Sequence, residues 1–396
     1  MKKPAINGGS PVRSKDNFLV FGAPLIKDQE IDEVVASMKS GWLGTGPKVA
    51  RFEHGFAQYK GAPYSAAVNS CTAALHLSML AAGLKPGDEV ITTPMTFCAT
   101  VNAIIHCGAT PVLADVDPVT MNIDPEQVNQ KITSKTKAIL PVHFAGRSCN
   151  MDALCKIATS HHLKIIEDCA HAIETEYKGK QAGTFGDFGC FSFYVTKNIV
   201  TGEGGMVLAK KEKDIARIKR LALHGMSKDA WKRFSDDGYK HYYVEECGYK
   251  YNMMDIQAAM GIHQLEQVEH NWKKRQHIWQ TYNEAFSDLP VTLPAQVESD
   301  TRHAYHLYTP LVHIKELGKS RDWVLNAMTA ENIGVGVHYL PVHLHPFYRK
   351  TYGWNKNDFP NAHRIGERTL SLPISAALNY ADVDDVITAF RKVIKH

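Results

Sequence analysis

The residues of this sequence best suited to covalent chemistry are a lysine in apolar surroundings and an aspartate at the end of an apolar run. Lys197 lies between Val195 and Ile199, shortly after the aromatic pair Phe193 and Tyr194. A lysine in a dry site loses its proton readily, and its amine can then form a Schiff base with an aldehyde cofactor. A pyridine-ring cofactor also needs an anion beside its ring nitrogen, and Asp168 is the candidate. His171, three residues further on, is expected to stack on such a ring.

Each residue also has an ordinary structural explanation. A lysine after an aromatic strand is usually a surface side chain whose stem covers apolar neighbours. An aspartate at the end of a strand is usually a turn or cap residue. Neither residue decides the question by itself, so the elements around them matter.

Those elements are predicted to be two strands joined by a turn. Residues 163–168 form a β-branched run ending in two carboxylates, which is typical of a buried parallel strand. Its carboxyl end would present Asp168 to the crevice where open α/β sheets bind ligands. Residues 188–194 are predicted to be a second strand that runs into Lys197.

The chain before this segment alternates between strand and helix, which indicates right-handed βαβ units and a mostly parallel sheet. An extended N-terminal arm is followed by a helix over residues 28–40, capped by Asp28 and ended by Gly41. The further elements expected are strands at 65–69, 89–92, 111–114 and 138–142, and helices at 49–59, 98–107, 125–131 and 151–160.

Five motifs, in order, closely resemble those of the sugar aminotransferase family often called DegT/DnrJ/StrS. These motifs are EDCAHA (167–172), GTFGD (183–187), FSF (191–193), KN (197–198) and TGEGG (201–205). Members are fold-type I enzymes that depend on pyridoxal 5′-phosphate (PLP). Five ordered matches in so short a stretch are far more specific than a single glycine-rich pattern. The resemblance extends from Phe21 to the LSLP motif at 370–373.

The resemblance implies an α/β protein of the fold-type I aminotransferase class. We expect a large, mostly parallel three-layer α/β/α domain with an N-terminal arm over residues 1–250. A long linking helix over 251–288 and a smaller C-terminal α+β domain over 289–396 would follow. In that smaller domain, strands are expected at 305–313 and 335–339, and helices at 320–332 and 382–395.

The resemblance also assigns residues that hold the cofactor. Small residues between the strand at 65–69 and the next helix leave backbone N–H groups free for an anion, although a plain Ser/Thr N-cap looks the same. The family places a phosphate cradle here, which would include Thr72 and Cys71, the latter where many members carry glycine. Ser192 is expected to bind the same phosphate. Phe97 matches the aromatic residue that stacks on the PLP ring, and a core phenylalanine is the alternative.

A further segment implies a homodimer with shared active sites. Residues 248–255 resemble the family segment that reaches the phosphate group bound by the neighbouring subunit. At two positions of this segment many members carry Asn and Arg, whereas this sequence has Lys250 and Asn252. In this respect the sequence resembles the subset of the family that aminates UDP-linked 4-keto sugars. Asn252 is therefore expected to bind the phosphate in trans. The substrate contacts implied by the resemblance are Phe21, Trp42, Thr45, His338, Tyr339 and His343, although the histidines could equally be structural.

The function implied is transfer of an amino group from L-glutamate to a nucleotide-linked keto-deoxy sugar. The expected acceptor is a UDP-4-keto hexose, for cell-surface glycan or lipopolysaccharide biosynthesis. One alternative is a PLP-dependent nucleotide-sugar dehydratase, in which histidine replaces the Schiff-base lysine. Another is a regulatory protein of this fold that has lost catalysis. Lys197 argues against the first alternative, and the intact set of Asp168, His171, Ser192 and Lys197 argues against the second.

Composition excludes several other classes. The chain has 396 residues, of which 44% are hydrophobic and 22% charged, as in an ordinary globular enzyme. A net charge of +4 gives no support for nucleic-acid binding. Without a targeting segment, a membrane span or paired cysteines, the protein is expected in the cytoplasm. The histidine pairs at 161–162 and 343–345 lack zinc-site spacing, so no metal is expected. The polar and aromatic stretch 225–248 is predicted to cover the substrate.

Overall fold

The computed structural model describes residues 3–227 and 241–396, so most of the predicted substrate-covering stretch lies outside the described residues. A seven-stranded sheet forms the centre of the molecule, in the order β1-β9-β8-β5-β4-β2-β3. The strands are β1 (Tyr64–Val68), β2 (Glu89–Thr92), β3 (Thr110–Leu113), β4 (Thr136–Leu140), β5 (Lys164–Asp168), β8 (Phe188–Ser192) and β9 (Gly205–Ala209). Strand β9 was not expected and runs antiparallel to both its neighbours, whereas β5, β4, β2 and β3 pair in parallel as expected.

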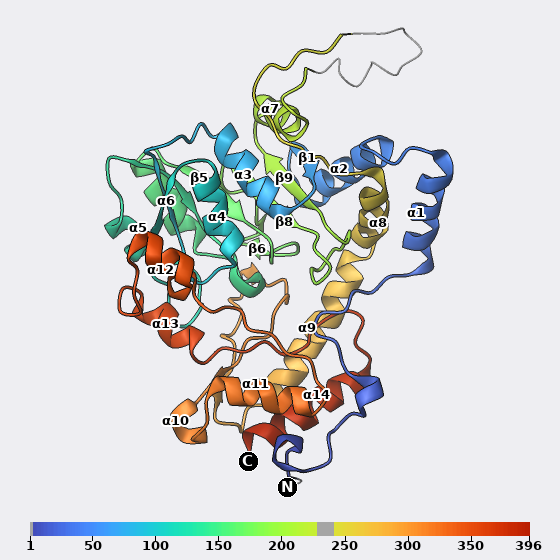
Figure 1. The fold of residues 1–396 in the computed structure, drawn as a ribbon, viewed down its shortest axis with the longest axis vertical. Helices are drawn as coiled ribbons and strands as arrows, with labels where there is room; N and C mark the ends of the chain where they lie inside the picture. The colour runs from blue at the N-terminus through green and yellow to red at the C-terminus, as the bar shows by residue number, and fades with distance from the viewer. Residues whose placement is uncertain (1–2, 228–240) are drawn as a thin grey trace.

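Helices cover both faces of this sheet, which gives the expected three layers (Figure 1). Side chains alternate along each strand: in β9, Val207 packs into the core on one face and Met206 into the core on the other. One face carries α3 (Cys71–Ala81), α4 (Cys98–His106) and α7 (Glu212–Ala222). The other carries α2 (Pro47–Lys60), α5 (Pro125–Gln130), α6 (Met151–Ser160) and α8 (Asp255–Glu266).

Two predicted helices differ in detail from the structure. Helix α1 (Asp28–Ser40) ends at Gly41 as expected, but Lys27 is its N-cap and Asp28 is already helical. The expected long linking helix is two helices, α8 and α9 (Val268–Ala285), separated at Gln267. Figure 1 shows α9 running from the sheet region down to the C-terminal part of the molecule. A continuous apolar spacing concealed this break, because both helices bury residues of the same pattern.

The C-terminal part has its own apolar core, to which α9, α11 (Arg321–Ala330) and α14 (Tyr380–Ile394) contribute. The strands predicted at 305–313 and 335–339 are wrong in extent: the structure has β10 (Val291–Thr292), β12 (Leu311–Val312) and an isolated bridge between Gly336 and Ser371. The structure also has α10 (Ile314–Leu317), α12 (Pro346–Tyr352), α13 (Pro360–Gly366) and the small sheet of β6 (Glu176–Tyr177), β7 (Lys180–Gln181) and β11 (Thr301–Arg302).

The first part of the N-terminal arm packs on this C-terminal part. Glu331 accepts hydrogen bonds from the backbone N–H groups of Ala5 and Val12, and Arg13 forms ion pairs with Asp382 and Asp385. Both ends of the chain therefore lie at the same pole of the molecule (Figure 1). Within residues 3–227 and 241–396, no helix combines the length and the apolar character needed to cross a membrane.

Candidate active site

A cavity of about 600 Å³ opens at the carboxyl ends of β5 and β8. Its wall is assembled from the first turn of α3, the start of α4, the loop after β8 and the segment 337–339. Segments far apart in the sequence thus meet at the edge of the sheet where α/β folds bind ligands. The predicted residues that line the cavity are Cys71, Thr72, Phe97, Asp168, His171, Ser192, Lys197, His338 and Tyr339.

Asp168 ends β5 and is 4% exposed. One carboxylate oxygen accepts a hydrogen bond from Thr100 Oγ1 at 2.8 Å, and the other accepts one from the backbone N–H of Ala170 at 3.1 Å. Burial raises the pKa of Asp168, and these two hydrogen bonds and the charge of Lys197 only partly oppose that effect. Because each oxygen keeps a free lone pair and the group lines the cavity, a cationic donor there would stabilise the carboxylate.

Lys197 reaches the same cavity from the loop after β8. Its backbone N–H bonds to the carbonyl of Tyr194 at 2.8 Å, which closes a turn before the lysine. Burial lowers the pKa of Lys197 to about 8, and the negative charge of Asp168 opposes this effect. A substantial fraction of the amine is therefore unprotonated near neutral pH, as a nucleophile requires.

The first turn of α3 has the features of a helix N-terminus that can bind an anion. Ser70 is the N-cap of the helix, and its hydroxyl accepts from the backbone N–H of Ala73, so the N–H groups of Cys71 and Thr72 are not used by the cap. Ser192 Oγ accepts from the N–H of Tyr194 at 3.4 Å and keeps its own proton for another acceptor. Cys71 is the first helical residue and has a negative φ, so the site does not need a glycine at this position.

His171 and Tyr339 form a hydrogen-bonded pair on the cavity wall. Tyr339 Oη lies 3.0 Å from His171 Nε2, and the two rings are stacked with an interplanar angle of 14°. The N–H of Ala145 donates to His171 Nδ1 at 3.3 Å, so the ring proton lies on Nε2 and is donated to Tyr339. Burial also lowers the pKa of His171 well below its ordinary value, which keeps the ring neutral. The ring of Phe97 is 59% exposed and lines the cavity with a free face.

Five predicted residues do not line the cavity of their own chain. Asn252 donates to Thr45 Oγ1 at 2.7 Å, and Trp42 Nε1 donates to the carbonyl of Thr45, so these three form a separate cluster. Phe21 stacks on the cavity residue His338 with ring centroids 5.7 Å apart. His343 is fully buried against Phe359, away from the cavity.

The structure adds residues that the sequence analysis did not select. Thr100 bonds to Asp168 and also to Thr96, which lies just before the N-cap of α4, and both threonines line the cavity. Their spacing of four residues at the start of a helix was the available signal, but it is common in helices that bind nothing. Tyr194 and Glu203 also line the cavity.

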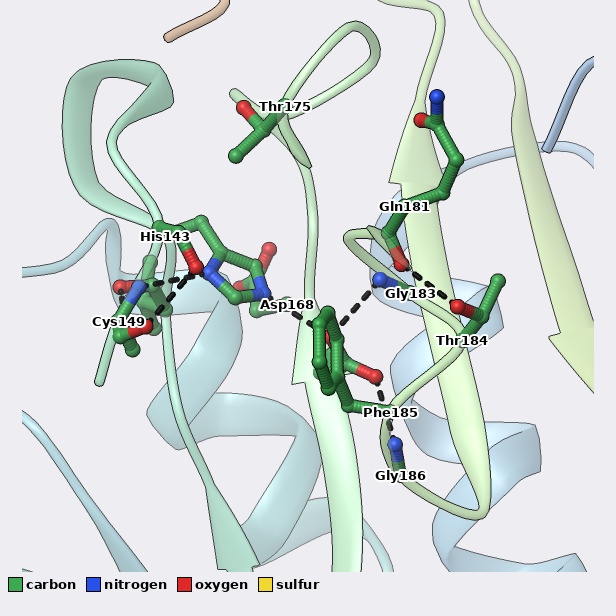
Figure 2. Close-up of polar contacts among 12 residues, drawn as sticks. His143, Cys149, Asp168, Thr175, Gln181, Gly183, Thr184, Phe185 and Gly186 are labelled. Atoms are coloured by element: carbon green, nitrogen blue, oxygen red, sulfur yellow. Dashed lines mark hydrogen bonds and ion pairs between the residues drawn. The ribbon is translucent and has the colours of Figure 1, made fainter. Parts of the chain in front are cut away.

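Among the described residues, one group could in principle hold a metal ion: His143, Glu167 and Cys169, with ligand atoms within 4.8 Å of one another. The carboxylate of Glu167 already accepts from His143 Nε2 and from the N–H groups of Gly183 and Gly186. Figure 2 labels these three donor residues. Although burial raises it, these donors hold the pKa of Glu167 below its ordinary value. These hydrogen bonds hold the side chain of Glu167 in place, next to Asp168 in β5. Because His143 and Glu167 bond to each other and Glu167 also accepts from two backbone N–H groups, the three residues do not form an open set of metal ligands.

Most of the chain resembles one known family of proteins. A model of the DegT/DnrJ/EryC1/StrS aminotransferase family matches residues 24–391. The spore coat polysaccharide biosynthesis protein SpsC of Bacillus subtilis is 49% identical over 385 residues, which are 97% of this chain and 99% of that protein.

Two solved structures extend the comparison. Spr1654 of Streptococcus pneumoniae, assigned as a sugar aminotransferase and solved in PLP and PMP forms, superposes with a TM-score of 0.88. Its PMP form is 32% identical and covers 96% of this chain and 98% of its own. PseC of Helicobacter pylori, an aminotransferase involved in the biosynthesis of pseudoaminic acid, has a TM-score of 0.88 and 28% identity, and the match covers 96% of this chain and 100% of that one.

Proposed function

Because this chain belongs to the DegT/DnrJ/EryC1/StrS aminotransferase family, and is therefore a sugar aminotransferase that uses PLP, we propose that it aminates a nucleotide-linked keto-deoxy sugar with L-glutamate as donor. One observation carries the proposal. A half-buried lysine with a lowered pKa, a buried carboxylate and the first turn of α3 face one cavity.

The residues present fit the cofactor. When bound, PLP supplies an aldehyde that forms a Schiff base with an amine and a protonated pyridine ring that accepts electrons. Asp168 has free lone pairs for the ring N–H, and the exposed face of Phe97 offers a stacking surface. The N–H groups at the start of α3, with the hydroxyls of Thr72 and Ser192, would hold the phosphate. The volume of about 600 Å³ is within the range of ligand pockets of this kind.

The residues of the chain would then act in turn. Lys197 Nζ would hold the cofactor, and its amine, when free, would be the base that takes the proton from the donor's α-carbon. The carboxylate of Asp168 would stabilise a positive charge on the ring nitrogen. The hydroxyl of Tyr339, which accepts from His171 Nε2, has its own proton free to donate to a sugar oxygen.

The proposed acceptor is a UDP-4-keto hexose used for a cell-surface glycan or lipopolysaccharide. Support comes from Lys250 and Asn252, which match the subset with that specificity, and from relatives named for polysaccharide and pseudoaminic acid biosynthesis. We also propose that the reaction takes place in the cytoplasm, since all eight cysteines are unpaired.

We further propose a homodimer with shared sites. Helix α1 exposes the apolar side chains of Ile31, Val35 and Met38 at helical spacing, and these are 52%, 39% and 61% exposed. Asn252 does not line the cavity of its own chain, which leaves it available to a second copy. A Val35→Glu variant should lower the mass of the assembly in light scattering and reduce activity with it.

The proposed function is tested with the pyridoxamine 5′-phosphate form of the protein. UDP-, dTDP- and GDP-linked 3-keto and 4-keto sugars are added in turn, and the return of PLP absorbance is recorded. The proposal is supported if the PLP absorbance returns with a UDP-4-keto hexose but does not return with the same keto sugar lacking its nucleotide. Keto sugar consumed without amination would favour a dehydratase, and a protein that never acquires PLP would favour the non-catalytic alternative.

A further inference from the structure

The loop that carries Lys197 is fixed immediately after the lysine by a side chain. Asn198 is 8% exposed, and its amide is fully used. Its Nδ2 donates to Glu174 Oε2 at 2.8 Å and to the carbonyl of Ala304 at 3.1 Å, and its Oδ1 lies 2.9 Å from His306 Nδ1. The turn closed by Tyr194 holds the other side of the lysine, so the backbone is restrained at both ends.

The chemistry of these partners fixes their orientation. Both groups that face Asn198 Nδ2 are acceptors, so the amide cannot be reversed without losing two hydrogen bonds. Asn198 Oδ1 must then accept from His306, whose neutral ring carries its proton on Nδ1. Burial lowers the pKa of His306 well below its ordinary value, which keeps this arrangement across the neutral range.

Behind Asn198 lies a buried ion pair. Glu174 is 0% exposed, and its second oxygen, Oε1, pairs with Arg275 Nη2 from α9. Burial raises the pKa of Glu174, an effect that Arg275 and the hydrogen bond from Asn198 oppose. A buried pair of this kind contributes little net stability because of its desolvation cost. The ion pair instead orients Glu174, so that its other carboxylate oxygen, Oε2, points at Asn198, the residue next to Lys197.

We propose that Asn198 is the positioning residue for Lys197, and that the Glu174–Arg275 pair acts through it. The proposal rests on the proposed role of Lys197. Ala304, His306 and Arg275 all belong to segments after residue 250, so the direction of the lysine amine depends on how α9 and the C-terminal part dock on the large sheet. A displacement of about 1 Å of a reacting group can reduce a rate about a hundredfold.

The test separates positioning of the lysine from construction of the cavity. Pyridoxamine 5′-phosphate binds without a Schiff base, so its affinity, measured by calorimetry, reports the cavity. The rate at which the apo-protein forms a Schiff base with PLP, followed by absorbance, reports the lysine. For Asn198→Ala we expect an affinity for pyridoxamine 5′-phosphate within about twofold of wild type and a capture rate lower by about tenfold to a hundredfold. Equal losses in both measurements, or no loss in either, would overturn the proposal.

The chain offers a matched control in Asn122. It is 3% exposed, and its amide also makes three hydrogen bonds, to the backbone of Phe144, Arg147 and Ser148, but it does not line the cavity. Asn122→Ala should leave the capture rate unchanged in the folded protein, and a loss equal to that of Asn198→Ala would count against the proposal.

A second variant tests the proposal if Asn198→Ala does not fold. Glu174→Gln keeps the shape and removes the charge, and a capture rate reduced about threefold to tenfold with unchanged affinity for pyridoxamine 5′-phosphate is expected. An unchanged rate there would overturn the part assigned to Glu174. Lys197→Ala identifies which proposal fails: if it still forms a Schiff base in the cavity, the role of Lys197 itself is wrong.

Discussion

The pH dependence of Schiff-base formation is the most direct prediction for Lys197. Burial lowers the pKa of Lys197 to about 8. Asp168 is the charge that opposes this effect, since burial raises the pKa of the Cys71 thiol and keeps it neutral. At pH 7 about a tenth of the amine is then unprotonated, compared with about 0.04% for a free lysine of pKa about 10.4. The structure thus accounts for about a two-hundredfold gain in reactive amine at pH 7.

The assay mixes apo-protein with PLP between pH 6.5 and 10 and follows the absorbance of the Schiff base. The capture rate should rise about tenfold per pH unit at low pH and become constant above about pH 8. Asp168→Asn removes the opposing charge, so its profile should become constant at a lower pH even where the amplitude is reduced. A rate that still rises at pH 10 would refute the argument.

Lys60 is the internal control, because burial also lowers its pKa to about 8. Its amine donates to the carbonyl of Ile173 and to Gln181 Oε1, both at 2.7 Å, and it does not line the cavity. Borohydride reduction followed by peptide mass spectrometry should place the pyridoxyl group on Lys197 and not on Lys60. An adduct on Lys60 would show that a low pKa suffices without the cavity.

Three further predictions concern the site. Asp168→Asn should reduce turnover at least about a hundredfold, with an unchanged far-ultraviolet circular dichroism spectrum. Retained turnover would mean that a residue other than Asp168 binds the ring nitrogen. Tyr339→Phe leaves the Nε2 of His171 without its acceptor and should lower the free energy of unfolding of the apo-protein by about 1–3 kcal/mol in urea titrations. An unchanged value would mean that His171 finds another partner. Mixed dimers of Lys197→Ala and an Asn252 variant that cannot bind phosphate should recover activity in at most about half their sites. Confirmed mixed dimers without activity would contradict binding of the phosphate in trans.

The sequence by itself determined the elements and the central chemistry. Alternating apolar residues in strands and the 3.6-residue period of helices are local properties, so most of the elements from α1 to β8 could be predicted. Asp168 and Lys197 were also recognisable, since a carboxylate at a strand end and a lysine among apolar residues are local features. Strand β9 of the large sheet was not predicted, because its run Gly205–Ala209 is short and apolar and periodicity alone does not classify such runs.

Only the tertiary structure decided which distant residues meet. Gln267 separates α8 from α9, although the apolar spacing continues across it, because packing against different neighbours determines where a helix ends. Trp42 and Thr45 join Asn252 outside the cavity, and no spacing in the sequence distinguishes that arrangement from contact with the ligand. The partners of Asn198 come from two segments far from it along the chain, Glu174 from one and Ala304 and His306 from the other. Side-chain hydrogen bonds depend on positions that the folded backbone alone creates, and for that reason the restraint on Lys197 became visible only in three dimensions.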